Sequence, residues 1–240
     1  MEEQIPDGLA PVQSMRQLVG PLIAITVGIF MVILDSTAMN VALPVLSDDF
    51  GRTLLDVQWT VTGYALAQAA VIPLAGWMSD KFGAKQIFII SLLLFTIGSV
   101  LCAQANTLEQ LIVFRVLQGL GGGMVLPIAF AMTFRMSPPE KAGSIMGMMG
   151  FPILMAPALG PMLAGYLVDY VNWQWIFLIN LPVGIIGLAL ALWQLPKLPK
   201  QVSASLDMLG IILGPLAFAG LSYGLSEGGV SWSSDRTIIG

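Results

Sequence analysis

The sequence contains no histidine, a single cysteine (Cys102) and few charged residues, which make up 10% of its 240 positions. A histidine-based catalytic triad, a zinc site and an intrachain disulfide are therefore excluded within this chain. No cluster of basic residues indicates a nucleic-acid partner. Soluble domains carry about 25% charged residues, whereas this chain is 56% hydrophobic and has too little polar surface to cover a soluble core. The lipid bilayer is therefore its expected solvent.

Apolar segments recur along the chain and reach the length of about 20 residues that a helix needs to span a bilayer. They are continuous rather than alternating, which favours helices over the strands of a membrane barrel. The sequence thus predicts an all-α membrane protein. The predicted spans are 18–43, 57–78, 86–104, 110–134, 142–168, 175–195 and 207–225.

Polar stretches divide the chain into four parts. Residues 1–17 lack the basic start of a signal peptide and are predicted to be a cytoplasmic tail, followed by a six-helix transmembrane bundle over 18–195. Residues 196–206 are predicted to be a cytoplasmic linker. Residues 207–240 then hold a seventh span, an outer loop and the start of an eighth span, so we expect a fragment of a longer protein.

The distribution of lysine and arginine predicts a cytoplasmic N-terminus, because cytoplasmic loops carry an excess of these residues. In that orientation only Arg52 and Arg236 fall on the outer side. The inner side holds Arg16, Lys81, Lys85, Arg135, Lys141, Lys197 and Lys200.

Two charged residues, Asp35 and Arg115, lie well inside the apolar segments. Charges in the membrane interior are costly and are functional candidates by default. Counted from the outer ends of their spans at 1.5 Å per residue, the two lie within about 5 Å in depth, and Gln118 lies one turn from Arg115. We therefore predict that the charges pair, directly or through Gln118 or water. The alternatives are a helix-packing role for Asp35 and an Arg115 side chain that extends to the outer interface.

The turn between the second and third segments reads Gly76-Trp-Met-Ser-Asp80-Lys81-Phe-Gly83-Ala-Lys85. Gly76 is expected to let helices approach closely, and Gly83 permits a tight turn. Asp80 is expected to cap the next helix or to pair with a lysine. The stretch is either a solvated hairpin or a latch whose charged pairs form in one conformation and break in another.

The fifth segment is rich in glycine, proline and methionine. Gly143 and Gly147, four residues apart, suit close helix packing. The prolines predict kinks, and the methionines are expected to fill gaps in the core rather than to contact a drug. The segment is either a packing helix or a gating hinge.

A weak internal repeat relates the ends of two segments. Gly165-x-x-x-Asp169 in the fifth repeats the spacing of Gly76-x-x-x-Asp80 in the second. Three spans apart, these matches fall on opposite sides of the membrane, as an inverted pair of three-helix units predicts. A chance match is the alternative.

Ordered motifs run through the first six segments. They are Leu34-Asp35-x-Thr37-x-x-Asn40-Val41-Ala42-Leu43-Pro44, the turn 76–85, Arg115-x-x-Gln118-Gly119-x-Gly121, Gly160-Pro161-x-x-Ala164-Gly165 and the stretch 173–184. In order and spacing they resemble the first-span, loop, fourth-span, antiporter and sixth-span motifs of the major facilitator superfamily. The match is specific for its bacterial fourteen-span drug/proton antiporter branch and covers roughly residues 20–228.

The resemblance implies the six-helix N-terminal bundle of the major facilitator fold, a 3+3 inverted repeat, followed by a seventh span. It implies a proton-driven multidrug efflux antiporter of the cell membrane that exports small amphipathic compounds by alternating access. The expected partners are the lipid bilayer, protons, the substrate and a C-terminal half of the same protein. No enzyme chemistry, cofactor or metal is implied beyond the proton gradient as energy source.

The resemblance also implies roles for individual residues. Asp35 is expected to be the protonation-linked carboxylate, with Arg115 and Gln118 as its partners in proton coupling. The turn residues Gly76, Asp80, Lys81, Gly83 and Lys85 would form the cytoplasmic latch, and Asn40, Gly160, Pro161 and Gly165 would belong to the substrate and antiporter motif. The alternatives are a proton-coupled solute symporter of the same fold and a truncated membrane protein that does not transport.

Overall fold

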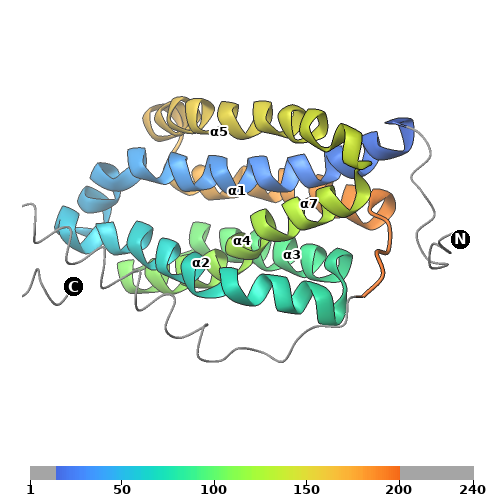
Figure 1. Cartoon of the computed structure of the whole chain (residues 1–240). Coiled ribbons are helices and arrows are strands. Elements are labelled where there is room, and N and C mark those ends of the chain that lie inside the picture. The colour runs from blue at the N-terminus through green and yellow to red at the C-terminus, as the bar shows by residue number, and fades with distance from the viewer. Residues whose placement is uncertain (1–14, 201–240) are drawn as a thin grey trace, which may run out of the picture. The chain divides into compact units, whose positions relative to one another are not determined.

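The chain folds into a bundle of long helices, shown as a computed structural model in Figure 1, in which residues 15–200 are described. Six helices in this part are long and apolar enough to cross a membrane, which confirms the all-α fold and the six predicted spans before the linker. The predicted seventh span, the outer loop and most of the N-terminal tail lie outside the described residues. The first five spans are α1 (Met15–Phe50), α2 (Leu54–Phe82), α3 (Ala84–Ala103), α4 (Leu108–Met136) and α5 (Ala142–Tyr170), with a short 3-10 turn η1 (Pro139–Lys141) before α5.

The sixth span is divided into α6 (Gln174–Leu178) and α7 (Asn180–Gln194), with Ile179 between them. The interruption matters for the site, because Asn180 begins α7 inside an otherwise apolar segment.

Specific caps and turns set several helix ends. Thr53 and Asp56 form a reciprocal capping box at the start of α2, in which each side chain accepts a hydrogen bond from the other residue's backbone N–H. Thr107 caps α4 by accepting a hydrogen bond from the Gln110 backbone N–H. Gly83 joins α2 to α3 at φ +106°, a conformation that favours glycine, as the sequence predicts.

The helices pack with α1 near the centre (Figure 1). α5 lies along one side of α1, and α4 packs between α2 and α3. α7 contacts both α1 and α3. The helices α1, α4 and α7 therefore meet inside the bundle, and this meeting point holds the polar residues described below.

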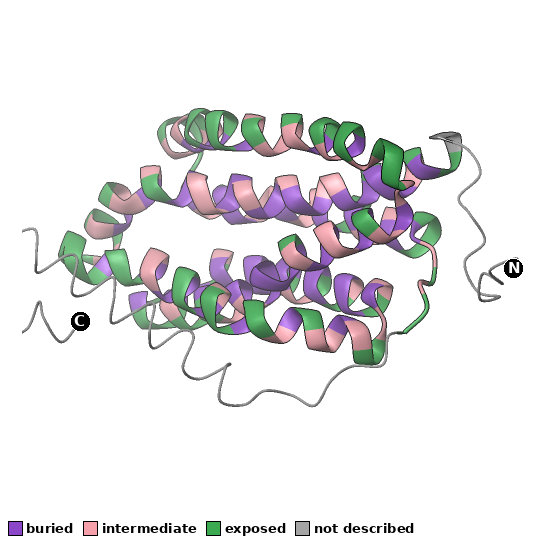
Figure 2. Cartoon of the chain, in the orientation of Figure 1, coloured by how far each residue is buried: buried purple, intermediate pink, exposed green. Residues whose placement is uncertain are grey.

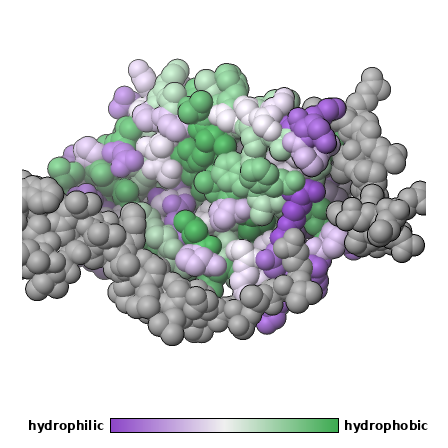
Figure 3. Space-filling model, in the orientation of Figure 1, coloured by the Kyte–Doolittle hydropathy of each residue, from purple (hydrophilic) through white to green (hydrophobic). Residues whose placement is uncertain are grey.

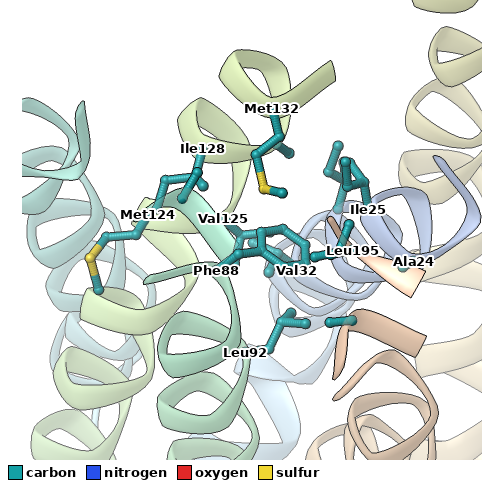
Figure 4. Packing of buried hydrophobic residues seen from close by; sticks show 14 of the residues in the cluster. Ala24, Ile25, Val32, Phe88, Leu92, Met124, Val125, Ile128, Met132 and Leu195 are labelled. Carbon is teal, nitrogen blue, oxygen red and sulfur yellow. The ribbon is translucent and has the colours of Figure 1, made fainter. Parts of the chain in front are cut away.

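A core of apolar side chains joins α1, α3 and α4 (Figure 4). Phe88 and Leu92 of α3, Val125 and Ile128 of α4 and Val32 of α1 belong to this core. In a membrane the exchange of lipid for protein contacts gives little hydrophobic driving force, so close packing and interhelical hydrogen bonds carry the association.

Three glycines predicted to support close packing do not do so. A Cβ added at Gly76, Gly143 or Gly147 would meet no atom within 4 Å in the described structure. Within residues 15–200 these predictions are therefore not confirmed, because the spacing of small residues on a helix does not show whether a partner lies against that face.

The methionines of α5 divide between core and surface. Met149 is buried, Met146 and Met155 are half-buried, and Met148 is exposed. The core assignment therefore holds for Met149, while Met148 contradicts it.

Candidate functional site

The two charges inside the bundle form a direct ion pair. The Arg115 Nη1 atom lies 2.7 Å from Asp35 Oδ2, and both side chains are 0% exposed. The pair links α1 to α4, which confirms the prediction that the two charges pair directly. Because Arg115 is completely buried, the alternative in which it extends to the membrane interface is wrong.

Two amides complete the coordination of the Asp35 carboxylate. Gln118 Nε2 donates to Asp35 Oδ1 at 3.1 Å, and Asn180 Nδ2 donates to the same oxygen at 2.7 Å. Gln118 Oε1 in turn accepts a hydrogen bond from Arg115 Nη1 at 2.7 Å. The carboxylate thus receives donors from α4 and α7, which is the additional hydrogen bonding that a buried ion pair needs to offset its desolvation.

The Arg115 guanidinium is held from several directions. Its Nε donates to the Thr60 carbonyl oxygen at 3.3 Å, and its Cζ lies 3.8 Å from the centroid of the Tyr64 ring. The Phe177 ring lies further away, at 5.7 Å. The Arg115 Nη2 atom is buried and finds no hydrogen-bond partner among the described residues. The charge is therefore compensated by Asp35 and by contact with an aromatic face, while the two N–H groups of Nη2 have no partner among the described residues.

A second hydrogen-bond chain extends from Asn180 into α3 and α6. Asn180 Nδ2 also lies 2.9 Å from Ser99 Oγ, which donates to the Phe177 carbonyl oxygen at 2.9 Å. Cys102 Sγ lies 3.6 Å from Gln118 Oε1. A change in the charge of Asp35 would therefore alter the hydrogen bonds of the interrupted sixth span.

Sequence reasoning missed several members of this cluster, among them Asn180, Ser99 and Tyr64. Asn180 carried a usable signal, since it is a polar residue within the apolar stretch 175–195 and belongs to the sixth-span motif. Tyr64 and Ser99 carried none, because either residue type is common at packed helix surfaces.

The turn between α2 and α3 is tied to the rest of the bundle by different contacts from those predicted. Asp80 forms an ion pair with Arg135 at the end of α4, and it neither caps α3 nor pairs with a lysine. That prediction is wrong, because Gly83 precedes α3 at the N-cap position without a side-chain cap, and the cation that pairs with Asp80 is Arg135. Lys85 Nζ donates to the Leu192 and Leu195 carbonyl oxygens at 2.8 and 2.6 Å.

Lys81 makes a further contact in this turn. Its Nζ lies 4.5 Å from the centroid of the Trp77 ring. The turn residues therefore connect α2 to α4, and α3 to the end of α7, with charged groups that can separate if these helices move.

None of the four residues of the antiporter motif forms a hydrogen bond with the Asp35 carboxylate in the described part of the chain. Asn40 is exposed and donates to the Ser36 carbonyl oxygen at 3.3 Å. Gly160 is buried where α5 meets α1, and a Cβ added there would clash with Thr37 and lie 3.1 Å from the Leu34 carbonyl oxygen. Pro161 is exposed, and Gly165 has no neighbour that a Cβ would contact. Of these four residues, Gly160 is the one whose backbone lies close to another helix within the part of the chain that the structure describes.

A bundle of six apolar helices around a buried carboxylate–guanidinium pair defines a multi-pass membrane protein with charge held inside the membrane. The family model of the Major Facilitator Superfamily matches residues 25–234, and the chain belongs to that superfamily.

Curated relatives carry drug-resistance names. The chain is 44% identical to "Multidrug resistance protein B homolog" of Mycobacterium tuberculosis, over 80% of this chain and 36% of the relative. It is 40% identical to "Putative multidrug resistance protein MdtD" of Enterobacter sp., over 82% of this chain and 42% of the relative. The chain thus spans less than half the length of these relatives.

The fold is shared with solved transporters. The proton:xylose symporter XylE superposes with a TM-score of 0.69 at 16% identity, over 91% of this chain and 55% of that one. Such a level of identity shows the fold alone. The superfamily and its structural neighbours are transporters rather than enzymes.

Proposed function

We propose that the chain is the N-terminal half of a proton-driven multidrug efflux antiporter, which exports small amphipathic compounds by alternating access. The chain with its C-terminal half is called the complete transporter below. The observation that carries the proposal is the fully buried Asp35 carboxylate, held by donors from α4 and α7. The names of the relatives support drug efflux, and their greater length supports a second half.

Asp35 is the proposed proton carrier. Its carboxylate pairs with the cation of Arg115, which lies against the Tyr64 ring. It also accepts a hydrogen bond from Gln118, whose Oε1 atom contacts the Cys102 thiol. Protonation would remove the charge that Arg115 faces and convert one acceptor oxygen into a donor. Because Asn180 and Gln118 both donate to Oδ1, the change weakens contacts to α4 and α7 together. The protonated and deprotonated clusters therefore favour different helix arrangements.

A pocket between α1, α2 and α4 is the proposed substrate wall of this half. It has a volume of about 390 Å³ and is lined by apolar residues together with Ser36 and Gln68. Gln68 Nε2 donates to Tyr64 Oη at 2.9 Å, and the Tyr64 ring lies against Arg115. A substrate that displaces Gln68 would therefore disturb the contacts that hold Arg115 on Asp35, which is a physical route for exchanging a proton for a substrate.

Transport by the complete transporter tests the proposal. In everted membrane vesicles that are acidified inside, a fluorescent cationic dye should accumulate, and a protonophore should abolish the accumulation. A matched vesicle that carries an Asp35→Asn variant of equal expression is the control. A symporter of this fold would instead drive dye and protons in the same direction, and a protein without transport would leave the dye outside under both conditions.

The proposal also places the protein in the bacterial cell membrane with a cytoplasmic N-terminus. Cysteines introduced at positions 197 and 232, after replacement of Cys102, report the orientation. Position 232 should react with an impermeant thiol reagent added outside intact cells, and position 197 should be protected. The reverse pattern would overturn this orientation.

A further inference from the structure

A second, larger pocket lies between α1, α5 and α7. Its volume is about 620 Å³, within the range of roughly 300–1,000 Å³ that small-molecule sites occupy. Most of its wall is apolar, with Phe30, Met31 and Leu34 from α1 and Leu159 and Leu163 among the contributions of α5. It shares no lining residue with the pocket between α1, α2 and α4, so it is a separate site on another face of α1.

The polar groups of this pocket favour a positively charged ligand. Asp169, near the end of α5, lines it together with Tyr166 and Tyr170, whose ring centroids lie 5.0 Å apart. Both tyrosines and Asp169 are exposed, and the described residues place no lysine or arginine in an ion pair with this carboxylate. A carboxylate beside aromatic rings at an apolar pocket attracts an organic cation through charge and through the negative faces of the rings.

The pocket also reaches the buried cluster. Asn180 lines it, and the same side chain donates to Asp35 and contacts Ser99 through its Nδ2 atom. The Asn180 Oδ1 atom accepts no hydrogen bond from the described residues. A ligand in the pocket therefore contacts a side chain that holds the Asp35 carboxylate in place.

Apolar side chains cover much of the face of the described bundle seen in Figure 3. In a protein that spans the membrane, such a surface lies against lipid or another transmembrane element. We propose that the pocket between α1, α5 and α7 is a second binding site, for an amphipathic organic cation that enters from the bilayer. The export of such a ligand rests on the proposed function, whereas its binding does not.

Tetraphenylphosphonium and tetraphenylborate provide a matched pair of probes, because they share shape and size and differ in the sign of the charge. Met162 lines the pocket and is exposed, so a Met162→Cys variant of the complete transporter, with Cys102→Ala, reports its occupancy. The rate of reaction of this cysteine with a methanethiosulfonate reagent is measured in detergent without a proton gradient. We expect tetraphenylphosphonium to slow the reaction and tetraphenylborate to leave it nearly unchanged.

Separate substitutions test the contribution of the Asp169 charge and the need for the free volume of the pocket. Asp169→Asn should raise the tetraphenylphosphonium concentration needed for half-protection by about fivefold, the scale of a partly exposed charge contact. Asp48→Asn is the matched control, since Asp48 is an exposed carboxylate outside the pocket lining. Leu159→Trp should fill the pocket and abolish protection, whereas Leu93→Trp, at an exposed position of α3 outside this lining, should not.

Three results would overturn the proposed site. They are equal protection by the two probes, an unchanged Asp169→Asn variant, and a cysteine at position 162 that is unreactive without any probe because lipid or another segment occupies the pocket. A failure of the proposed function looks different, because protection at position 162 would persist while dye accumulation no longer depended on the proton gradient.

Discussion

α4 and α5 are both rich in glycine and both contain proline, but they use these residues in opposite ways. Gly119, Gly121 and Gly123 of α4 press against the backbones of α2 and α3, so that a Cβ at Gly121 would lie 2.6 Å from the Phe95 backbone nitrogen. On α5, a Cβ added at Gly143, Gly147, Gly150 or Gly165 would meet no atom of the described residues within 4 Å, whereas Gly160 is in close contact with α1. Similar glycine and proline contents therefore go with close packing of α4 against its neighbours and with an exposed surface on α5.

The pattern of burial agrees with this contrast (Figure 2). Exposed residues predominate along α5, with Leu154 77% exposed, whereas buried residues line α4 around Arg115 and Gln118. Because α4 packs between α2 and α3, it holds the ion pair in a defined geometry, which buried charges require. α5 packs mainly against α1 and exposes its other faces, so it is able to meet a second bundle or to shift against α1, as alternating access requires of some element.

The largest effect should follow from a methyl group added to α4. Gly121→Ala places a Cβ against the Phe95 nitrogen and the Ser91 carbonyl oxygen, which are backbone atoms and cannot turn aside. We expect a loss of about 3 kcal/mol in unfolding free energy, at the upper end of overpacking costs. Thermal unfolding in detergent measures it. An unchanged midpoint would show that α3 and α4 are not in this close contact.

An intermediate effect should follow from Arg115→Lys. Lysine keeps the charge but loses the planar fork that serves Asp35, Gln118 and the Thr60 carbonyl oxygen together. We expect a stability loss of about 2 kcal/mol and reduced transport with normal membrane insertion.

Arg52→Lys is the matched control for that substitution. Arg52 pairs with Glu109 at 2.8 Å, but both side chains are more than half exposed. Arg52→Lys should therefore lower the free energy of unfolding by less than about 1 kcal/mol. Equal losses for the two substitutions would reduce the role of Arg115 to a bare positive charge.

The smallest effect on the fold should come from α5. Gly147→Ala adds a Cβ that meets nothing within 4 Å and improves helix propensity by up to about 1 kcal/mol. The midpoint of thermal unfolding should therefore stay the same or rise slightly. A clear drop in the isolated chain would mean that this face of α5 packs against a residue outside 15–200, and the contrast with α4 would then fail.

The sequence was a good guide to depth along the membrane and a poor guide to direction around each helix. The positions of Asp35 and Arg115 within their spans predict the pair because the count of residues fixes depth. Asn180 and Tyr64 escaped prediction because the side of the helix on which a neighbour lies depends on how all the helices are arranged. Gly76 and Gly147 failed for the same reason, since a small residue permits a contact without supplying the partner.

The loop contacts show a similar limit. The sequence identifies Asp80 as a charged turn residue, but its partner Arg135 lies at the far end of α4, 55 positions along the chain. Local sequence favours a nearby lysine, and only the packing of α2 on α4 makes the arginine the closer cation. Gly83 was predictable because its requirement, a positive φ, is local.

The central claim is that Asp35 carries the transported proton, and an Asp35→Asn variant of the complete transporter tests it most directly. The amide preserves size but cannot bind and release a proton. Gradient-driven dye accumulation in everted vesicles is measured across a range of pH for Asp35→Asn, and for Asp48→Asn, an exposed carboxylate on the same helix, as control. The account predicts that Asp35→Asn loses gradient-driven accumulation at normal expression while Asp48→Asn behaves as the parent. Normal export by Asp35→Asn at every pH would contradict it and would leave Asp35 with a structural role.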